Sequence, residues 1–237
     1  MKRLGVNIDH IATLRNARGE GHPNIIKAAK NIMRYGANSI TVHLREDRRH
    51  IKDNDLLLLT NLKIPINLEM ASNIKMLNIA LKTKPKYVCL VPEKRKEITT
   101  EGGLNIKKNK NKLVKIIEKL NKNKIRTSLF IDPNIKDIKF SKYLGANCIE
   151  LHTGKISNLI KKNKNYRNEL KKIYDCAKFA KSLNLEVHAG HGIDYKTAKH
   201  LSKIKYIEEY NIGHFIIGES IAHGLSHVIK KFKKIIK

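Results

Sequence analysis

Short apolar runs alternate with longer amphipathic segments along this chain, and the pair recurs about every 30 residues. The short runs are rich in Ile, Val and Leu, which is typical of strands that are covered on both faces. In the longer segments apolar residues recur with the helical period, as Leu113, Ile116, Ile117 and Leu120 do. The pattern therefore predicts a series of β-strand–α-helix units.

The predicted strands are Leu4–Ile8, Ser39–His43, Ile66–Glu69, Tyr87–Val91, Thr127–Ile131, Cys148–His152, Leu185–Ala189 and Tyr210–Ile212. The predicted helices cover 24–35, 53–62, 72–83, the Lys-rich stretch around 113–120, 135–144, 166–183, 195–204 and a last segment that ends at Ile236. We expect the stretch from Asp9 to Arg18 to be a loop, and Asp53 to cap its helix. Eight units predict an α/β fold, a (β/α)8 TIM barrel in which a closed parallel sheet is surrounded by helices. A doubly wound sheet is the alternative.

Neither a linker nor a low-complexity tract divides the chain, so we expect residues 1–237 to form a single (β/α)8 barrel domain. The hydrophobic content of 41% is ordinary for a globular protein. No apolar run approaches the ~20 residues of a membrane helix, and the N-terminus lacks the apolar region of a signal peptide, so we expect a cytoplasmic protein. The 3 cysteines are widely spaced, which predicts buried free thiols and argues against a disulfide framework or a zinc site.

The formal net charge of +28 invites comparison with nucleic-acid-binding proteins. The lysines, however, are concentrated in 107–124, 161–172 and 230–237, where they alternate with Asn and Ile in the manner of solvated helix faces. A nucleic-acid surface would combine Arg with aromatic residues, and aromatic residues make up only 5% of this chain. The composition therefore argues against nucleic acid as the main partner, although the positive field would attract small anionic substrates.

The predicted strand Ser39–His43 ends in a histidine and continues into the Arg-rich segment Leu44–His50. Taken alone, this segment could be a charged surface loop. Other predicted strands of this chain also end in His, Glu, Asp or Asn, and in a barrel all carboxyl ends of the strands meet at one rim. The repetition favours a catalytic rim over a surface loop.

The candidate residues at this rim are Asn7, Asp9, His10, His43, Arg45, Glu69, Thr99, Glu150, His152, His191, Gly213 and His214. Each of them alone has a simpler explanation as a packing residue or as half of an ion pair. Together they predict general acid–base catalysis, because the pKa values of His and Glu side chains can be tuned to near neutrality.

Glycines near the end of the chain add a second signal. The segment Gly190–Gly192 follows one predicted strand, and Gly213 and Gly218 flank the start of the last helix, where such barrels bind phosphate through backbone N–H groups. The same glycines could simply permit tight turns. A second anion site is predicted from the arginines that follow the first two strands, which are Arg18, Arg45, Arg48 and Arg49. Two anion sites beside an acid–base cluster suggest that two phosphorylated substrates are joined.

Several reaction classes lack support in the sequence. No lysine ends a strand, which disfavours a Schiff-base aldolase, and no glycine-rich phosphate loop of the dinucleotide or NTPase type is present. A metal site remains an alternative, because the chain offers possible ligands in His43, Glu69, Glu150, His152 and His191. No closely spaced pair of histidines supports this alternative.

Long segments of the chain resemble the pyridoxine 5′-phosphate synthase family, in order and over essentially the whole length. The segments that carry the resemblance are 5–19, 40–51, 67–70, 91–95, 99–103, 149–154, 189–192 and 211–214. The chain differs from the family pattern at His188, where we would expect Asn, and we expect this position not to bear on the chemistry.

The resemblance implies a (β/α)8 barrel whose members assemble as an octamer built from dimers. It implies condensation of 3-amino-2-oxopropyl phosphate with 1-deoxy-D-xylulose 5-phosphate, with release of phosphate and water and without a metal or organic cofactor. His43 and Glu69 would accept protons. His191 would donate a proton, and Glu150 would stabilise charge in a transition state. The aminoketone phosphate would be bound by Asn7, Arg18, Gly192, Gly213 and His214. The deoxyxylulose phosphate would be bound by Asp9, His10, Arg45, His50 and Thr99.

Overall fold

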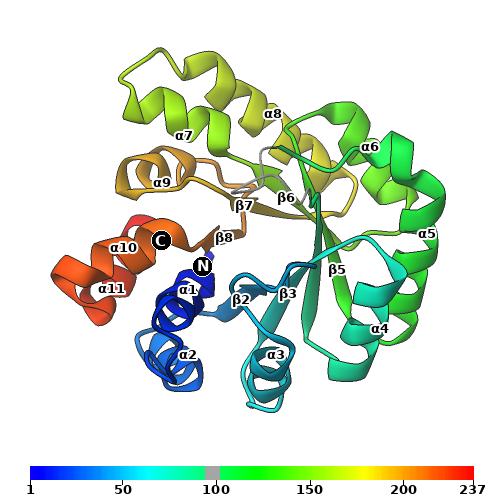
Figure 1. The fold of residues 1–237 in the computed structure, drawn as a ribbon. Helices are drawn as coiled ribbons and strands as arrows, with labels where there is room; N and C mark the ends of the chain where they lie inside the picture. Colours follow the sequence, from blue (N-terminus) through cyan, green and yellow to red (C-terminus); the bar gives the residue numbers. More distant parts are fainter. Residues whose placement is uncertain (94–101) are drawn as a thin grey trace.

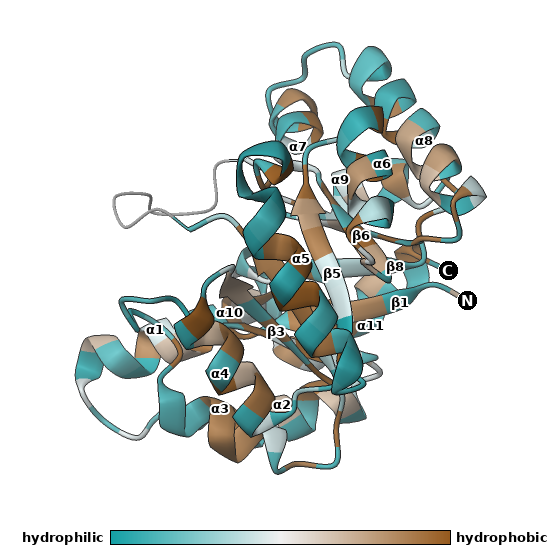
Figure 2. Ribbon diagram, turned by 90° about the vertical axis from the view of Figure 1, so that its right-hand side faces the viewer, coloured by the Kyte–Doolittle hydropathy of each residue, from teal (hydrophilic) through white to brown (hydrophobic). Residues whose placement is uncertain are grey.

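Eight parallel strands close into a barrel in the computed structural model, which describes residues 1–93 and 102–237 (Figure 1). Each strand pairs with the next along the chain, and the last pairs with the first. Helices surround the barrel in Figure 1, and both termini lie close together in Figures 1 and 2. The predicted TIM barrel is therefore confirmed, and the doubly wound alternative is wrong, because its sheet would have two unpaired edges.

The strands are β1 (Arg3–Asn7), β2 (Ser39–His43), β3 (Ile66–Ala71), β4 (Tyr87–Val91), β5 (Arg126–Ile131), β6 (Cys148–His152), β7 (Glu186–Gly190) and β8 (Glu209–Ile212). Every predicted strand is present, and the differences are confined to strand ends. Strand register places His43 beside Glu69 and Glu150 beside His188.

The helices in the described part of the chain are α1 (Asp9–Arg18), α2 (Ile25–Arg34), α3 (Asp53–Thr60), α4 (Ile74–Thr83), α5 (Ile106–Lys122), α6 (Ile135–Tyr143), α7 (Gly154–Lys161), α8 (Arg167–Ser182), α9 (Tyr195–Leu201), α10 (His214–His223) and α11 (Leu225–Ile235). Asp53 was predicted to cap α3. In the structure Lys52 occupies the N-cap position, and Asp53 is the first residue of the helix.

The prediction of a loop after the first strand is wrong, because that segment forms α1. This helix buries only Asp9, Ile11 and Ala12, so its sequence contains too few buried apolar residues to show a helical period. It ends at Gly19, whose φ of 70° is in the left-handed region that glycine adopts without strain. The last predicted helix is also divided in two, α10 and α11, at Gly224 with a φ of 75°.

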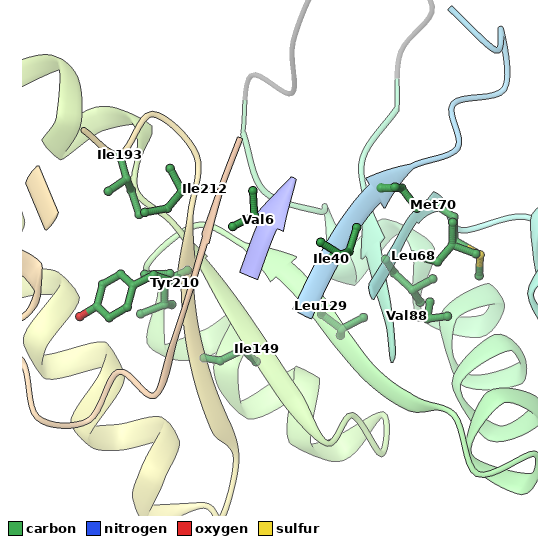
Figure 3. Close-up of a cluster of buried hydrophobic side chains, with 14 of the residues drawn as sticks. Val6, Ile40, Leu68, Met70, Val88, Leu129, Ile149, Ile193, Tyr210 and Ile212 are labelled. Atoms are coloured by element: carbon green, nitrogen blue, oxygen red, sulfur yellow. The ribbon is translucent and has the colours of Figure 1, made fainter. Parts of the chain in front are cut away.

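The hydrophobic core lies between the strands and the surrounding helices. Alternate strand residues such as Val6, Leu129 and Ile149 are fully buried and point outward from the barrel to this layer (Figure 3). Helix α5 shows the matching pattern, with hydrophobic residues on one side and hydrophilic residues on the other (Figure 2). The helices are thus held on the barrel by apolar burial along one face of each.

Polar side chains occupy several positions along the inner side of the barrel. Thr41, Asn67, Ser128, His188 and Asn211 are all buried on the inner side of their strands, where barrels of this type usually carry branched aliphatic residues. Hydrogen bonds connect some of them: Asn67 Nδ2 donates to Thr41 Oγ1, and this hydroxyl donates to Asn211 Oδ1, each over 3.4 Å. The polar interior continues directly into the residues at the carboxyl ends of the strands.

All three cysteines are free and buried, which confirms the prediction of free thiols. Among the described residues we find no helix with the combined length and apolarity that crossing a membrane requires.

Candidate active site

A cavity of about 310 Å³ opens at the carboxyl ends of the strands. It brings together most of the residues predicted for the catalytic rim, namely Asn7, Asp9, His10, His43, Arg45, His50, Glu69, Glu150, His191, Gly192, Gly213 and His214. The other residues that line it are Val91, Phe130, Lys161, Ile193, Asn211, Ile212 and Phe215. Residues far apart in the sequence become neighbours here because every strand of a closed parallel barrel ends at the same rim.

Among the described residues, Arg18 and His152 were predicted for the site but do not line this cavity. Arg18 ends α1 with a side chain that is 78% exposed, and its guanidinium lies 3.5 Å from a carboxylate oxygen of Glu20. Thr99 lies outside the described residues.

The predicted second anion site is only partly assembled. Arg45 is buried and lines the cavity. Arg48 forms a bidentate pair with Asp53 at 2.8 and 3.0 Å, and Arg49 lies 2.6 Å from Asp47. Neither Arg48 nor Arg49 is among the lining residues, so of the four arginines predicted for this site only Arg45 lines the cavity.

His43 lies between two carboxylates. Its Nδ1 is 4.0 Å from Glu69 Oε2, and its Nε2 is 3.4 Å from Glu93 Oε2. A third carboxylate, that of Asp9, accepts the backbone N–H of His43 at 2.9 Å and a side-chain N–H of Asn7 at 3.0 Å. This arrangement places two groups that can carry protons, the His43 imidazole and the Glu69 carboxyl, side by side at the cavity wall.

Glu93 was not predicted as a site residue, although it follows β4 at a strand end like the others. Burial would raise the pKa of its carboxyl group, but the adjacent His43 ring and a hydrogen bond from the backbone N–H of Glu46 hold that pKa below its ordinary value. The Glu46 bond is 2.6 Å long. Glu93 is therefore a carboxylate that orients His43. The criterion used for the other candidates, a polar residue at the carboxyl end of a predicted strand, would also have identified Glu93.

Glu69 and Glu150 are two buried acids that face the same cavity. Burial raises the pKa of Glu69 well above its usual value, and the nearby Glu150 and Asp9 carboxylates raise it further. Burial also raises the pKa of Glu150, to about 7, although the positive charge of His188 and a hydrogen bond from Asn211 act in the opposite direction. The raised pKa values make both acids candidates for proton transfer in the cavity.

His191 is held in an unusual backbone conformation. Its φ is 78° and that of Gly192 is 76°, a pair of left-handed residues directly after β7. The hydroxyl of Thr153 donates to the carbonyl oxygens of Gly190 and His191, both at 2.8 Å, and so stabilises this turn. Burial, His152 and Lys161 together lower the pKa of His191 to about 4. The imidazole is therefore neutral at pH 7 in the unliganded cavity.

A cluster of histidine rings lines the opposite part of the wall. The ring centroids of His10 and His214 are 4.9 Å apart, and those of His10 and His50 are 5.8 Å apart. Burial lowers the pKa of His50 to about 4, with further contributions from neighbouring cationic groups that include His10 and Arg45. An anion beside the partly buried His50 ring would raise the pKa of that ring.

The start of α10 lies at the cavity, where the sequence predicts a phosphate site. Gly213, His214 and Phe215 line the cavity at the first turn of this ten-residue helix. A Cβ atom on Gly213 would lie 2.8 Å from the Cβ of Asn7, so only glycine fits there. Backbone N–H groups at a helix N-terminus bind phosphate well. Gly218, which was predicted for the same site, lies within α10 and does not line the cavity.

The five residues proposed as metal ligands do not form one cluster. His152 is bonded to Asp132 through Nδ1 at 3.0 Å and is not a lining residue. Asp9, His43 and Glu69 do place ligand-type atoms within 4.8 Å of one another. Both oxygens of Asp9 accept hydrogen bonds from protein N–H groups.

The sequence model of the family described as "Pyridoxal phosphate biosynthesis protein PdxJ" matches residues 4–237 of this chain. A pyridoxine 5′-phosphate synthase from Pelagibacter ubique (strain HTCC1062) is 61% identical over 236 residues, with 99% of each chain covered. The protein of that name from Ehrlichia chaffeensis is 49% identical over 234 residues, which are 98% of this chain and 96% of that one. A solved 2-keto-3-deoxy-6-phospho-gluconate aldolase from Zymomonas mobilis aligns with a TM-score of 0.63 at 14% identity, over 99% and 93% of the two chains, a likeness of fold alone.

Proposed function

The chain belongs to the family of the pyridoxal phosphate biosynthesis protein PdxJ, and from this membership we propose that it is a pyridoxine 5′-phosphate synthase. The proposed reaction condenses 3-amino-2-oxopropyl phosphate with 1-deoxy-D-xylulose 5-phosphate and releases phosphate and water. One observation on this structure supports the proposal independently of the names of the relatives. His43, Glu69, Glu150 and His191 come from four different strand ends and line one cavity.

His43 and Glu69 act as proton acceptors in this proposal. Ring closure requires removal of protons from carbon and nitrogen, and such steps need a base whose pKa is near the working pH. The raised pKa of Glu69 suits this role, and the carboxylates on both sides of His43 stabilise the imidazolium that forms when the ring accepts a proton.

His191 acts as the proton donor. Its pKa of about 4 leaves the free imidazole neutral, so the donor form must be created when substrate binds. A phosphate bound at Gly192 and Gly213 supplies a negative charge next to the ring and raises its pKa. Proton donation is then coupled to the presence of the phosphorylated substrate. Glu150 stabilises positive charge that develops during the reaction.

The two substrates are assigned to two parts of the cavity. Residues assigned to the aminoketone phosphate are Asn7, Arg18, Gly192, Gly213 and His214. Residues assigned to the deoxyxylulose phosphate are Asp9, His10, Arg45, His50 and Thr99. The two groups meet at His10 and His214, whose ring centroids are 4.9 Å apart, and each group offers donors for a phosphate.

Assembly and domain organisation are proposed on the same grounds. We propose that residues 1–237 act as one (β/α)8 barrel domain and that the protein forms the octamer implied by the resemblance. The reaction is proposed to proceed on protein side chains alone, without a metal or an organic cofactor.

The direct test is an assay of purified protein with the two named substrates in the presence of EDTA. We expect a pyridine product and inorganic phosphate to appear together, and both signals to depend on both substrates. Glu69→Gln should abolish most of the turnover, whereas Glu118→Gln, on the exposed face of α5, should not change it. Phosphate release without a pyridine product, or no reaction at all, would contradict the proposal.

A further inference from the structure

A network of charged side chains lies beneath the active-site cavity, toward the amino ends of the strands. Arg3 donates to Glu186 and, over 2.7 Å, to Glu209, while Arg126 donates to Glu186 over 2.8 Å. His188 adds a third cationic group, with Nε2 2.7 Å from Glu186 Oε1 and Nδ1 3.9 Å from Glu209 Oε1. These five groups come from β1, β5, β7 and β8, so the closed barrel alone brings them together.

The network determines the charge of His188, which is only 2% exposed. Burial would lower the pKa of its imidazole, but the Glu209 carboxylate and hydrogen bonds with Cys148 and Glu186 outweigh burial and raise it to about 10. The pKa of Glu186 is correspondingly low, at about 2, because His188 and the arginines outweigh the effect of burial on its carboxyl group. His188 is therefore an imidazolium across the neutral pH range.

This buried cation lies next to Glu150. Strand register pairs His188 on β7 with Glu150 on β6, and both residues are buried on the inner side of the barrel. Gly190, the next inward position on β7, leaves room for the acid, since a Cβ atom there would lie 1.9 Å from Glu150 Oε1. The carboxylate thus occupies the space between the cavity and the imidazolium below it.

The groups around Glu150 have opposite effects on the pKa of its carboxyl group. Asn211 donates a hydrogen bond to Glu150 Oε2 at 2.7 Å, and His188 supplies the positive charge. The Glu69 and Glu209 carboxylates and the Cys89 thiol are the other titratable groups near it. Without His188, Glu150 would be a buried acid with one hydrogen-bond donor and two carboxylate neighbours, which favours its neutral form.

We propose that His188 is a positioning residue whose permanent positive charge keeps the Glu150 carboxylate ionised enough to act in the cavity. Residue 188 was expected not to bear on the chemistry, whereas in this proposal the charge of His188 acts on a residue of the active site. The catalytic consequence rests on the proposed function, in which Glu150 stabilises positive charge. The effect of the His188 charge on the pKa of Glu150 does not rest on the proposed function, because it can be measured without substrate.

The experiment is a titration of the Glu150 side-chain carboxyl by ¹³C NMR, with the resonance identified by its loss in Glu150→Gln. We expect the midpoint to rise by roughly 1 to 3 pH units in His188→Asn, and to stay near the native value in His188→Lys, which keeps a cation. His200→Asn replaces a histidine on α9, outside the barrel, and should leave the midpoint unchanged.

An unchanged Glu150 midpoint in a folded His188→Asn protein would overturn the proposal. A second measurement uses the native protein, so that a folding defect cannot hide the answer. The ¹⁵N shifts of the His188 ring, assigned through backbone resonances, should remain those of an imidazolium up to about pH 9, given the raised pKa. A ring that loses its proton near pH 6.5 would refute it. Failure of the substrate assay would contradict the proposed function but would not change the outcome of these titrations.

Discussion

Asn211 on β8 donates a hydrogen bond to Glu150 on β6 at 2.7 Å, across the intervening strand β7. Gly190 on β7 makes this contact possible, because any side chain at that position would displace the carboxylate. The amide of Asn211 is oriented by Thr41, whose hydroxyl donates to its Oδ1. Replacing Asn211 with Ala should therefore raise the pKa of Glu150, since the bond stabilises the charged form.

The Glu150 midpoint can be followed by NMR in Asn211→Ala and in Thr41→Val. Thr41→Val removes only the group that orients the amide, so we expect a smaller upward shift than for Asn211→Ala. The free energy of unfolding should fall by about 1–3 kcal/mol in Asn211→Ala, because Glu150 loses its donor. Equal midpoints in all three proteins would show that Asn211 does not influence Glu150.

Glu69→Gln tests the proposed base. The substitution keeps the shape and a hydrogen-bonding oxygen but removes the basic group, so turnover should fall by roughly 10²–10⁴ while substrate binding changes little. Steady-state kinetics separates the two quantities. A variant that unfolds at a lower temperature but turns over normally would show that Glu69 is structural.

The ionisation of Glu150 should make stability depend on pH. Its pKa is raised from 4.5 to about 7, so the folded protein retains a proton that the unfolded chain has lost within this range. The contribution of Glu150 to stability is therefore complete below pH 4.5 and is lost as pH rises through about 7, a change on the order of 3 kcal/mol.

Urea unfolding of the native protein and of Glu150→Gln, at pH 5 and pH 8, measures this change. The variant should gain stability relative to the native protein as pH increases, because glutamine does not ionise. The opposite trend, or parallel pH dependence of the two proteins, would show that Glu150 does not titrate in this range.

Thr153→Val should weaken the turn that holds His191. The buried hydroxyl donates to two carbonyl oxygens, and valine has nearly the same shape without the donor. We expect a loss of about 1–3 kcal/mol in unfolding free energy and a fall in turnover of tenfold or more, because small displacements of a catalytic group are costly. Thr153→Ser keeps the hydroxyl and should retain most of the turnover, and equal losses in both variants would contradict the assignment.

Phosphate should raise the pKa of two cavity histidines. His50 and His191 each have a pKa of about 4 in the unliganded protein, and a bound anion favours their protonated forms. NMR titration with and without inorganic phosphate measures both midpoints, and the exposed His227 on α11 provides an internal reference. Identical midpoints under the two conditions would argue against anion binding in the cavity.

Much of this architecture follows from the sequence because it is encoded locally. Each strand is a short apolar run, and a polar residue such as His43, Glu69 or Glu150 interrupts the run where the strand approaches the rim. The helix α1 escaped prediction because its few buried side chains do not produce an apolar period. Arg18, at the end of this helix, has an exposed side chain and is not among the residues that line the cavity.

The charges of the site are a property of the tertiary structure. Glu150, His188 and Asn211 lie on three different strands, and Arg3 and Glu209 are separated by almost the whole chain. The pKa of each group depends on burial and on distances of a few ångströms to its neighbours, which no periodicity in the sequence records. The sequence by itself determined which residues reach the rim, whereas closure of the barrel decided which of them are charged, because only closure sets the distances between them.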